Sequence, residues 1–215
     1  IRPGQVNLMT AGRGISHSEE SPSVRSAQLH GAQLWIALPE NQRHCEPAFE
    51  HYPELPVVER DGFRITVLVG EAFGERAPTR VFSPMLALDL TSNGEAATTL
   101  ALPADFEFGA LMLEGQGCVD GQNVKVGQLL YLGSGRDRLP LRNAEPGGSF
   151  RLLLIGGAPF GEEILMWWNF VGRSRSELAQ AVIDWNAGDP RFGSVRGYAG
   201  ERLVAPATPW PALRV

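Results

Sequence analysis

A histidine and a glutamate two residues apart, His17 and Glu19, are the side chains of this sequence best suited to chemistry. Residues i and i+2 of an extended chain point to the same side, so the imidazole and the carboxylate can converge on one point. Such ligands suit Fe(II), Mn(II), Ni(II) or Cu(II), with iron favoured for O₂ chemistry. The carboxylate of Glu19 could also accept a proton from a substrate. Taken alone, the pattern is a weak signal, because most such pairs are solvated or hydrogen-bonded for structural reasons.

The segment that carries this pair occurs twice in the chain. Residues 1–19 (IRPGQVNLMTAGRGISHSE) align with residues 124–137 (VKVGQLLYLGSGRD) when Gly4 is placed on Gly127. A repeat at this range predicts two copies of one supersecondary unit. The second copy has Pro140 and Arg142 where the first has the histidine and the glutamate, so only the first copy offers metal ligands.

The other histidines and the cysteines show no diagnostic spacing. His30 precedes an expected strand and reads as structural, while His44 and His51 lie in a polar, proline-rich connection and are expected to be exposed. Cys45 and Cys118 have no histidine at a spacing that would activate a thiolate, so neither receives a nucleophilic role. A small basic cluster is expected to be solvated: Arg136, Arg138 and Arg142.

The elements that must position His17 and Glu19 are a strand and a glycine turn. Residues 6–9 alternate apolar and polar, which predicts a strand, and residues 10–14 contain two glycines that can adopt positive φ. Residues 33–38 (QLWIAL) predict a buried strand that ends at Pro39. Residues 41–59 are rich in proline and predict an irregular connection, with a domain boundary near Asp61-Gly62.

The chain beyond this boundary predicts a sandwich or barrel. Short apolar strands alternate with glycine-containing turns at regular intervals, which is typical of all-β architectures. Strands are expected at residues 63–69, 85–90, 97–102, 106–113, 124–132, 139–142 and 150–155. Turns are expected at residues 93–94, 114–115, 120–121 and 146–148.

The last segment changes to a helical period. Ser174 and Glu177 form a capping box, and Gly188 is placed to end the helix. An apolar stripe runs between these caps through Leu178, Val182 and Trp185. Residues 164–171 (ILMWWNFV) predict a strand covered on both faces, and the tail from Arg191 is expected to run over the surface.

Bulk properties exclude several classes. The chain has 215 residues and a formal net charge of −5, so we expect no direct binding to nucleic acid. It has two cysteines, and the sequence shows no run long enough to span a membrane and no signal peptide. We therefore expect a cytoplasmic monomer with no membrane association.

The first copy of the repeat has no counterpart of residues 106–121, which precede the second copy. We infer that the sequence lacks the N-terminal part of its first domain. The alternative is a natural N-terminus at a degenerate half-repeat.

The sequence resembles the pirin family along essentially its whole length. The residues that carry the resemblance are MTAGRGISHSE (9–19), HGAQLWIALP (30–39) and WWNFVGRSRSE (167–177). The resemblance implies an all-β bicupin, two cupin-type β-barrels with one C-terminal α-helix. We expect residues 1–60 to be the C-terminal part of a metal-bearing N-terminal cupin, residues 61–160 a cupin without metal ligands, and residues 161–215 a return strand, helix and proline-rich tail.

The resemblance also implies a site of three histidines and one glutamate for a divalent metal, usually iron. His17 and Glu19 match the later two ligands, and the further histidines are expected upstream of Ile1, since no His-x-His occurs in this sequence. The implied activity is that of a quercetin 2,3-dioxygenase, which opens a flat, flavonol-like substrate with O₂ and releases carbon monoxide. Met9 and Trp35 would suit such a substrate. The alternative is a non-enzymatic regulatory or redox-sensing protein that acts on a protein partner.

Overall fold

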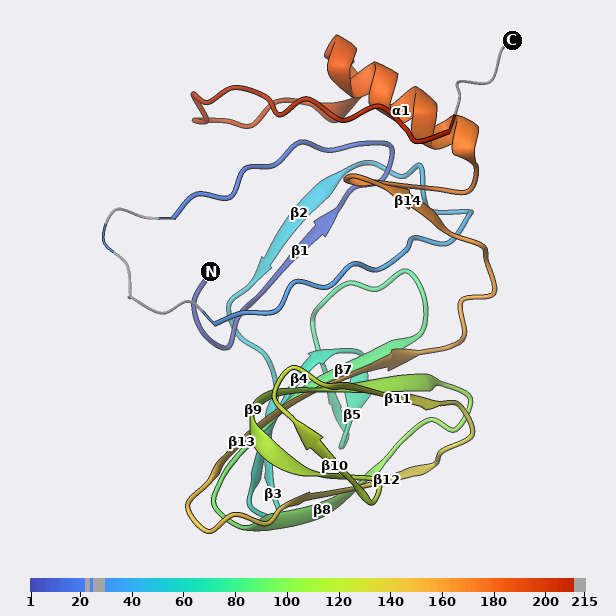
Figure 1. Ribbon diagram of the computed structural model, residues 1–215. Coiled ribbons are helices and arrows are strands. Elements are labelled where there is room, and N and C mark those ends of the chain that lie inside the picture. Colours follow the sequence, from blue (N-terminus) through green and yellow to red (C-terminus); the bar gives the residue numbers. More distant parts are fainter. Residues whose placement is uncertain (22–23, 25–29, 211–215) are drawn as a thin grey trace. The chain divides into compact units, whose positions relative to one another are not determined.

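A computed structural model describes residues 1–21, 24 and 30–210, which form two compact units (Figure 1). The first unit comprises Ile1–Leu8 and Phe49–Phe160. The second comprises Met9–Ala48 and Gly161–Val215, so it is assembled from two distant parts of the chain. These units are defined by contacts in space. The predicted domains, residues 1–60, 61–160 and 161–215, are defined by the sequence repeat and stay a prediction.

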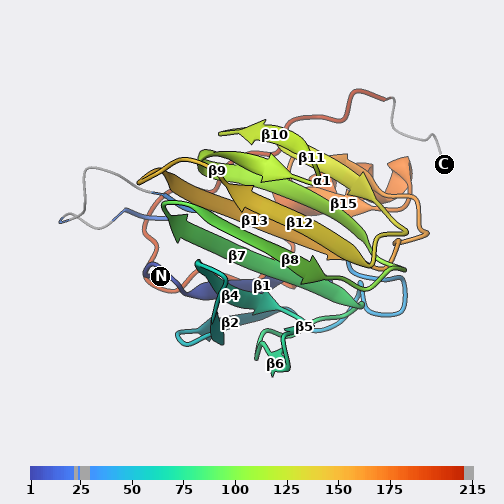
Figure 2. The ribbon, with the colours of Figure 1, turned by 90° about the horizontal axis from the view of Figure 1, so that it is seen from below.

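The first unit is built on one antiparallel sheet that curls into a barrel. Its strands follow the order β3-β4-β7-β13-β9-β12-β8, and both β10 and β11 also pair with β9. Figure 2 shows β4, β7, β13 and β9 lying side by side. The bounds are β3 Val57–Arg60, β4 Phe63–Val69, β7 Met85–Asn93, β8 Ala96–Ala101, β9 Glu107–Val119, β10 Gln122–Lys125, β11 Leu129–Gly133, β12 Arg138–Asn143 and β13 Ser149–Gly157. A small hairpin of β5 (Glu71–Ala72) and β6 (Glu75–Arg76) follows β4.

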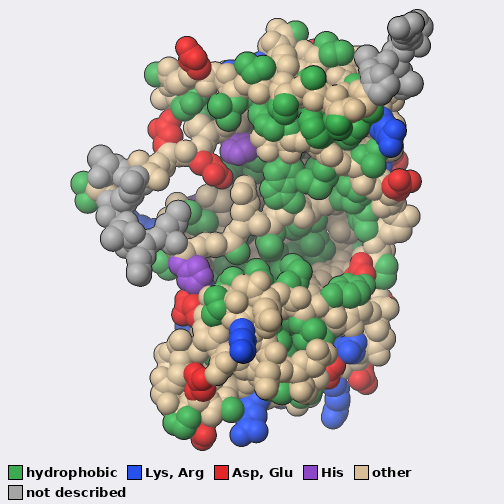
Figure 3. Space-filling view, viewed as in Figure 1, with side chains coloured by type: hydrophobic (Ala, Val, Ile, Leu, Met, Phe, Trp, Pro, Cys, Tyr) green, Lys and Arg blue, Asp and Glu red, His purple; other side chains and the backbone are tan. Residues whose placement is uncertain are grey.

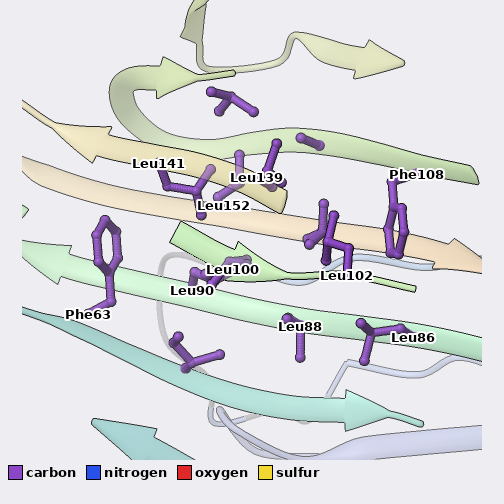
Figure 4. Packing of buried hydrophobic residues seen from close by; sticks show 14 of the residues in the cluster. Phe63, Leu86, Leu88, Leu90, Leu100, Leu102, Phe108, Leu139, Leu141 and Leu152 are labelled. Atoms are coloured by element: carbon purple, nitrogen blue, oxygen red, sulfur yellow. The ribbon is translucent and has the colours of Figure 1, made fainter. Parts of the chain in front are cut away.

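Alternation along these strands creates the core of the barrel. Phe63, Ile65 and Val67 of β4 are all 0 % exposed, as the period-2 pattern predicts. The rings of Phe63 and Phe150 meet edge to face, with centroids 5.4 Å apart. Figure 4 shows buried side chains from several strands converging between the sheet's faces, among them Leu88, Leu90, Leu100, Phe108, Leu139, Leu141 and Leu152. Burying each of these side chains contributes about 1.5–3 kcal/mol.

Two features of the barrel differ from the sequence-based predictions. Residues 124–132 do not form one strand: β10 ends at Lys125 and β11 begins at Leu129, because Gly127 (φ 80°) makes a turn closed by the Gln128 N–H and the Lys125 carbonyl. Residues 114–115 do not form a turn either. Gly115 (φ 68°) lies inside β9 opposite Phe150, and the register against β13 shifts two residues away, at Leu113, which is the signature of a β-bulge.

The repeat is visible in the backbone. β1 (Val6–Thr10) pairs with β2 (Ala48–Tyr52), and the alignment that places Gly4 on Gly127 places the ends of β1 on the ends of β11. Both glycines have the same left-handed conformation, with φ of 79° and 80°. The two copies therefore share a turn and the strand that follows it.

The second unit contains the one α-helix among the described residues, α1 (Arg175–Ala187), and a short 3₁₀ helix, Pro190–Phe192. The predicted caps are confirmed: the Ser174 hydroxyl accepts from the Glu177 N–H, and Gly188 is left-handed. Leu178 and Val182 are buried. The tail runs beside the helix (Figure 1), where Asn186 exchanges two hydrogen bonds with the backbone of Ala205.

The predicted strand at residues 164–171 is a hairpin of β14 (Leu165–Trp167) and β15 (Phe170–Gly172). The chain reverses at Trp168, which takes a positive φ of 53°. The cost of that conformation is offset by ring packing, because Trp168 lies 5.4 Å from Phe170 and 5.6 Å from Trp185 between centroids. An apolar composition alone could not reveal this reversal.

The predicted buried strand at residues 33–38 is wrong. The segment has no regular structure, and Leu34, Trp35 and Ile36 are 41 %, 50 % and 47 % exposed. A strand needs a neighbour for its backbone groups, and no described strand pairs with this segment. The carbonyl of Leu38 instead accepts a hydrogen bond from the Arg173 guanidinium at 2.7 Å.

Candidate functional site

The segment that carries the predicted ligands, residues 10–19, is called the donor loop below. β1 ends at Thr10, and a tight turn follows in which the Gly14 N–H donates to the Ala11 carbonyl at 2.9 Å. Gly12 and Gly14 both have positive φ, 50° and 143°, as the two glycines of the sequence predict. From Ala11 onward the loop has no helix or strand, so its shape depends on contacts with other segments.

His17 and Glu19 both lie exposed on this loop. Within the described part of the chain, no hydrogen bond or ion pair engages either side chain. Both are therefore free to bind a ligand. No group of three or more histidine, cysteine, aspartate or glutamate side chains that could hold a metal ion occurs among the described residues. Their joint ligation of a metal stays a prediction.

The predicted exposure of two further histidines is confirmed, whereas the structural role of His30 and the lack of a nucleophilic cysteine stay predictions. His44 and His51 are exposed, and histidine side chains reach the surface in Figure 3. The His51 ring lies 2.7 Å from the Asn7 amide oxygen, a pairing between the strands β1 and β2. His30 is exposed and makes an interaction of its own. Cys45 and Cys118 are both free thiols.

Backbone contacts with the segment around Cys45 fix one side of the turn. The Arg13 N–H donates to the Cys45 carbonyl at 3.1 Å. A Cβ atom on Gly12 would lie 2.1 Å from that same carbonyl oxygen, so only glycine fits there. The Arg13 side chain pairs with Glu46, and this hydrogen bond raises the pKa of Arg13 and lowers that of Glu46.

The C-terminal part of the chain holds the other side of the turn. The Arg191 guanidinium donates to the Arg13 carbonyl at 2.7 Å. Phe192 lies against Gly14, where a Cβ would come within 3.0 Å of the ring. Sequence reasoning missed both residues, since they lie in a segment without periodic pattern, far along the chain from the loop they contact.

Polar atoms around this loop are left without partners. The described residues contain four buried side-chain atoms that lack a hydrogen bond, and three belong to the loop or to its contacts: Thr10 Oγ1, Ser16 Oγ and Arg191 Nε. Buried polar atoms normally find a partner in protein, water or ligand. The loop is thus held in place, although some of its buried polar atoms lack a hydrogen-bond partner.

His17 and Glu19 are of the chemical type that binds a divalent metal, but two ligands are too few to complete its coordination shell. A neutral imidazole and a carboxylate are ligands that Fe(II), Mn(II), Ni(II) and Cu(II) accept. Two donors leave most coordination positions to other groups. The residues therefore fit as part of a metal site.

Two family models match the chain. The model for pirin covers residues 1–36, and the model for the pirin C-terminal cupin domain covers residues 87–193. The predicted all-β bicupin with one C-terminal helix is confirmed by this match together with the barrel and the helix.

Relatives and solved structures agree with the family models. The chain is 52 % identical to a Pseudomonas aeruginosa protein whose name gives a provisional assignment as quercetin 2,3-dioxygenase; 98 % of this chain is matched to 65 % of that protein. It is 31 % identical to a pirin-like protein of Arabidopsis thaliana, with 94 % of this chain matched to 75 % of the relative. A crystal structure of quercetin 2,3-dioxygenase from Acinetobacter baumannii superposes with a TM-score of 0.91 at 44 % identity, covering 97 % of this chain and 69 % of that one.

The chain thus spans about two thirds of the length of these proteins. Its donor loop lies within the part matched by the pirin model. By sequence and by fold, the chain belongs to the pirin family.

Proposed function

We propose that this protein is a metal-dependent dioxygenase that opens the ring of a flavonol-like substrate with O₂. The observation that carries the proposal is the pair of unengaged side chains, His17 and Glu19, on a loop whose turn is held from two sides. The resemblance in sequence and structure to proteins named as quercetin 2,3-dioxygenases supports the reaction class. Fe(II) is the proposed metal.

The chain's own residues have distinct tasks in this proposal. His17 supplies an imidazole ligand, and Glu19 supplies a carboxylate that binds the metal and accepts the proton of the substrate hydroxyl. The metal, when bound, supplies Lewis acidity and a centre at which an ionised substrate and O₂ can be brought together. A closed site requires ligands beyond these two.

Exposed apolar side chains near the donor loop in sequence suit a flat aromatic substrate. Met9, at the end of β1, is 37 % exposed, and Trp35 is 50 % exposed. Aromatic and thioether side chains pack favourably on the face or edge of an aromatic ring. They would bind the substrate rings by contact, while Glu19 acts on the hydroxyl.

The test uses the full-length protein, reconstituted with Fe(II) without oxygen and then given quercetin and O₂. We expect about one iron per chain, bleaching of the flavonol absorption and release of carbon monoxide. Glu19→Gln should abolish turnover, because the amide cannot accept the proton, and His17→Ala should reduce bound iron. Glu20→Gln and His44→Ala are matched controls with exposed side chains and should behave as the wild type.

Two results would reject the proposal. Turnover that survives Glu19→Gln would remove the proposed base, and a wild-type protein that binds no metal would remove the site. Iron binding without turnover of any flavonol would favour the non-enzymatic alternative, in which a metal-containing protein acts on a protein partner.

A further inference from the structure

The backbone of Arg13 is held from two sides by segments far away in the sequence. Its N–H donates to the Cys45 carbonyl at 3.1 Å, and its carbonyl accepts from Arg191 at 2.7 Å. Arg13 lies four residues before His17 in the same loop. The position of the Arg13 backbone therefore sets where the chain leaves the turn toward His17 and Glu19.

Arg191 is itself fixed in place by three contacts. Its guanidinium pairs with Asp184 of α1 at 3.1 Å, and the guanidinium carbon lies 4.1 Å from the centre of the Phe192 ring. Its backbone N–H donates to the Asp189 side chain at 2.8 Å. A guanidinium fixed in this way can orient a carbonyl without losing much conformational entropy of its own.

Close packing adds to the hydrogen bond. The position of a Cβ on Gly14 would lie 3.0 Å from the Phe192 ring and 3.4 Å from the Arg191 guanidinium. The backbone of the turn therefore lies directly on this pair of side chains. Phe192 and Arg191 therefore prevent the turn from moving toward them.

Among the described residues, no arginine from another segment donates to a loop carbonyl of the second copy, whose loop is held by backbone hydrogen bonds with Leu102 and Ala104. There Arg136, which aligns with Arg13, donates to the Leu132 carbonyl of β11 and pairs with Asp120 at 3.0 Å. In the first copy the aligned arginine turns to Glu46, and a distant arginine takes the loop carbonyl. The copy that carries the ligand candidates is thus the one held by Arg191.

We propose that Arg191 is a positioning residue for His17 and Glu19, which acts by fixing the carbonyl of Arg13. The inference rests on the proposed function, in which these two side chains bind a metal. Groups that orient ligands without touching the metal commonly contribute about 10–100-fold to metal affinity. Arg191 would contribute through the backbone of the donor loop.

The experiment compares Arg191→Ala, Arg191→Lys and Arg202→Ala in the full-length protein. Arg202 is the matched control, because its guanidinium also lies over a ring of the same aromatic cluster, 4.5 Å from Trp185, and donates to a backbone carbonyl. It makes no contact with the donor loop among the described residues. Co(II) titration measures affinity and its absorption spectrum reports coordination, while hydrogen exchange of the amides at residues 12–14 reports on the loop without metal.

We expect Arg191→Ala to weaken Co(II) binding by about 10–100-fold and to alter the spectrum, with faster amide exchange in the loop. Arg191→Lys should restore part of both, and Arg202→Ala should change neither. Wild-type affinity and spectrum in Arg191→Ala, or loop exchange equal to that of Arg202→Ala, would overturn the inference. A wild-type protein that binds no Co(II) or Fe(II) would instead reject the proposed function, and the exchange data would still decide whether Arg191 holds the loop.

Should Arg191→Ala fail to fold, Gly14→Ala provides a second variant. It keeps the guanidinium but forces Phe192 and the turn apart. Weaker Co(II) binding with unchanged α1 circular dichroism is the expected result, and unchanged binding contradicts the inference.

Discussion

Gln5 and Gln128 make the same pair of hydrogen bonds in two copies of one turn. Each side-chain oxygen accepts from the backbone N–H of the residue three positions earlier, Arg2 at 2.8 Å and Lys125 at 2.9 Å. Each backbone N–H donates back to the carbonyl of that same residue, at 3.2 and 3.0 Å. The repeat thus preserves local hydrogen bonding. The residues that follow have diverged: the first copy continues as a loop with the candidate metal ligands, and the second continues into strand β12, which has none.

Replacing Gly12 by alanine should destabilise the second unit far more than the same change at Gly4 destabilises the first unit. Both residues have positive φ, but only at Gly12 would the new Cβ collide with a backbone oxygen, that of Cys45. We expect a cost of about 1 kcal/mol for Gly4→Ala and about 3 kcal/mol or more for Gly12→Ala. Urea denaturation measures both costs. Tryptophan fluorescence follows the second unit, which contains all five tryptophans, and far-ultraviolet circular dichroism follows the strands of the first. Equal costs would contradict the contact.

The second unit should lose stability in acid. The Glu40 N–H and then the Arg173 guanidinium lower the pKa of Glu162 below its ordinary value of 4.5. The Arg173 N–H, followed by the Arg43 guanidinium, does the same for Glu177. Because both folded-state pKa values lie below the unfolded ones, this stabilisation is present above about pH 4.5 and is lost as the pH falls through the folded values.

The measurement is thermal unfolding of α1 by circular dichroism between pH 7 and pH 3. The midpoint temperature of unfolding should decrease once the pH is below 4.5, the ordinary pKa of a glutamate. The decrease should be smaller in Glu162→Gln. Glu163→Gln is the control and should leave the profile unchanged, because Glu163 is exposed and makes no hydrogen bond or ion pair among the described residues. A profile of Glu162→Gln that matches the wild type would show that the ion pair has no part in the acid response.

Loss of the N-cap of α1 should be measurable in isolation. The Ser174 hydroxyl accepts from the Glu177 N–H at 3.2 Å, so Ser174→Ala should cost about 1 kcal/mol of unfolding free energy. The Ser176 hydroxyl contacts only that of Ser174 among the described side chains, and Ser176→Ala should cost little. A larger effect at Ser176 than at Ser174 would mean that the cap is assigned to the wrong residue.

The edge-to-face contact of Phe63 and Phe150 should appear as coupling between two core substitutions. Both rings are almost wholly buried, at 0 % and 1 % exposure. In a double-mutant cycle with Phe63→Leu and Phe150→Leu, we expect a coupling of about 0.5–1.5 kcal/mol. Chemical denaturation of the four proteins provides the values, and strict additivity would show that the rings do not interact.

The barrel was predictable because its strands have strong local signals. Alternation placed Phe63, Ile65 and Val67 on the inner face, and glycine turns separated most strands correctly. The errors arise where glycine has more than one use. Gly115 lies close to a bulge inside a strand and Gly127 in a turn between two strands, and both have positive φ. The sequence alone indicates that such a glycine has a positive φ, but it does not indicate whether the glycine lies in a turn or inside a strand.

The segments that surround the candidate site carry far weaker sequence signals than the two candidate ligands. His17 and Glu19 stand out by type and spacing, and the caps of α1 by position. Arg191 and the Cys45 carbonyl have no such signal, because a contact between backbone and a distant side chain imposes no spacing on the sequence. The segment 33–38 failed for the related reason that an apolar pattern does not reveal whether a partner strand is available.

The two-part composition of the second unit sets an order of events during synthesis. Residues 9–48 are synthesised before α1 and Arg191, and Arg191 follows 178 residues after the carbonyl that it holds. At about 5–20 residues per second, the donor loop waits roughly 9–36 seconds for this contact. Under the proposed function, the two candidate ligands are therefore synthesised before the arginine proposed to position them, and we expect metal loading to follow the synthesis of Arg191.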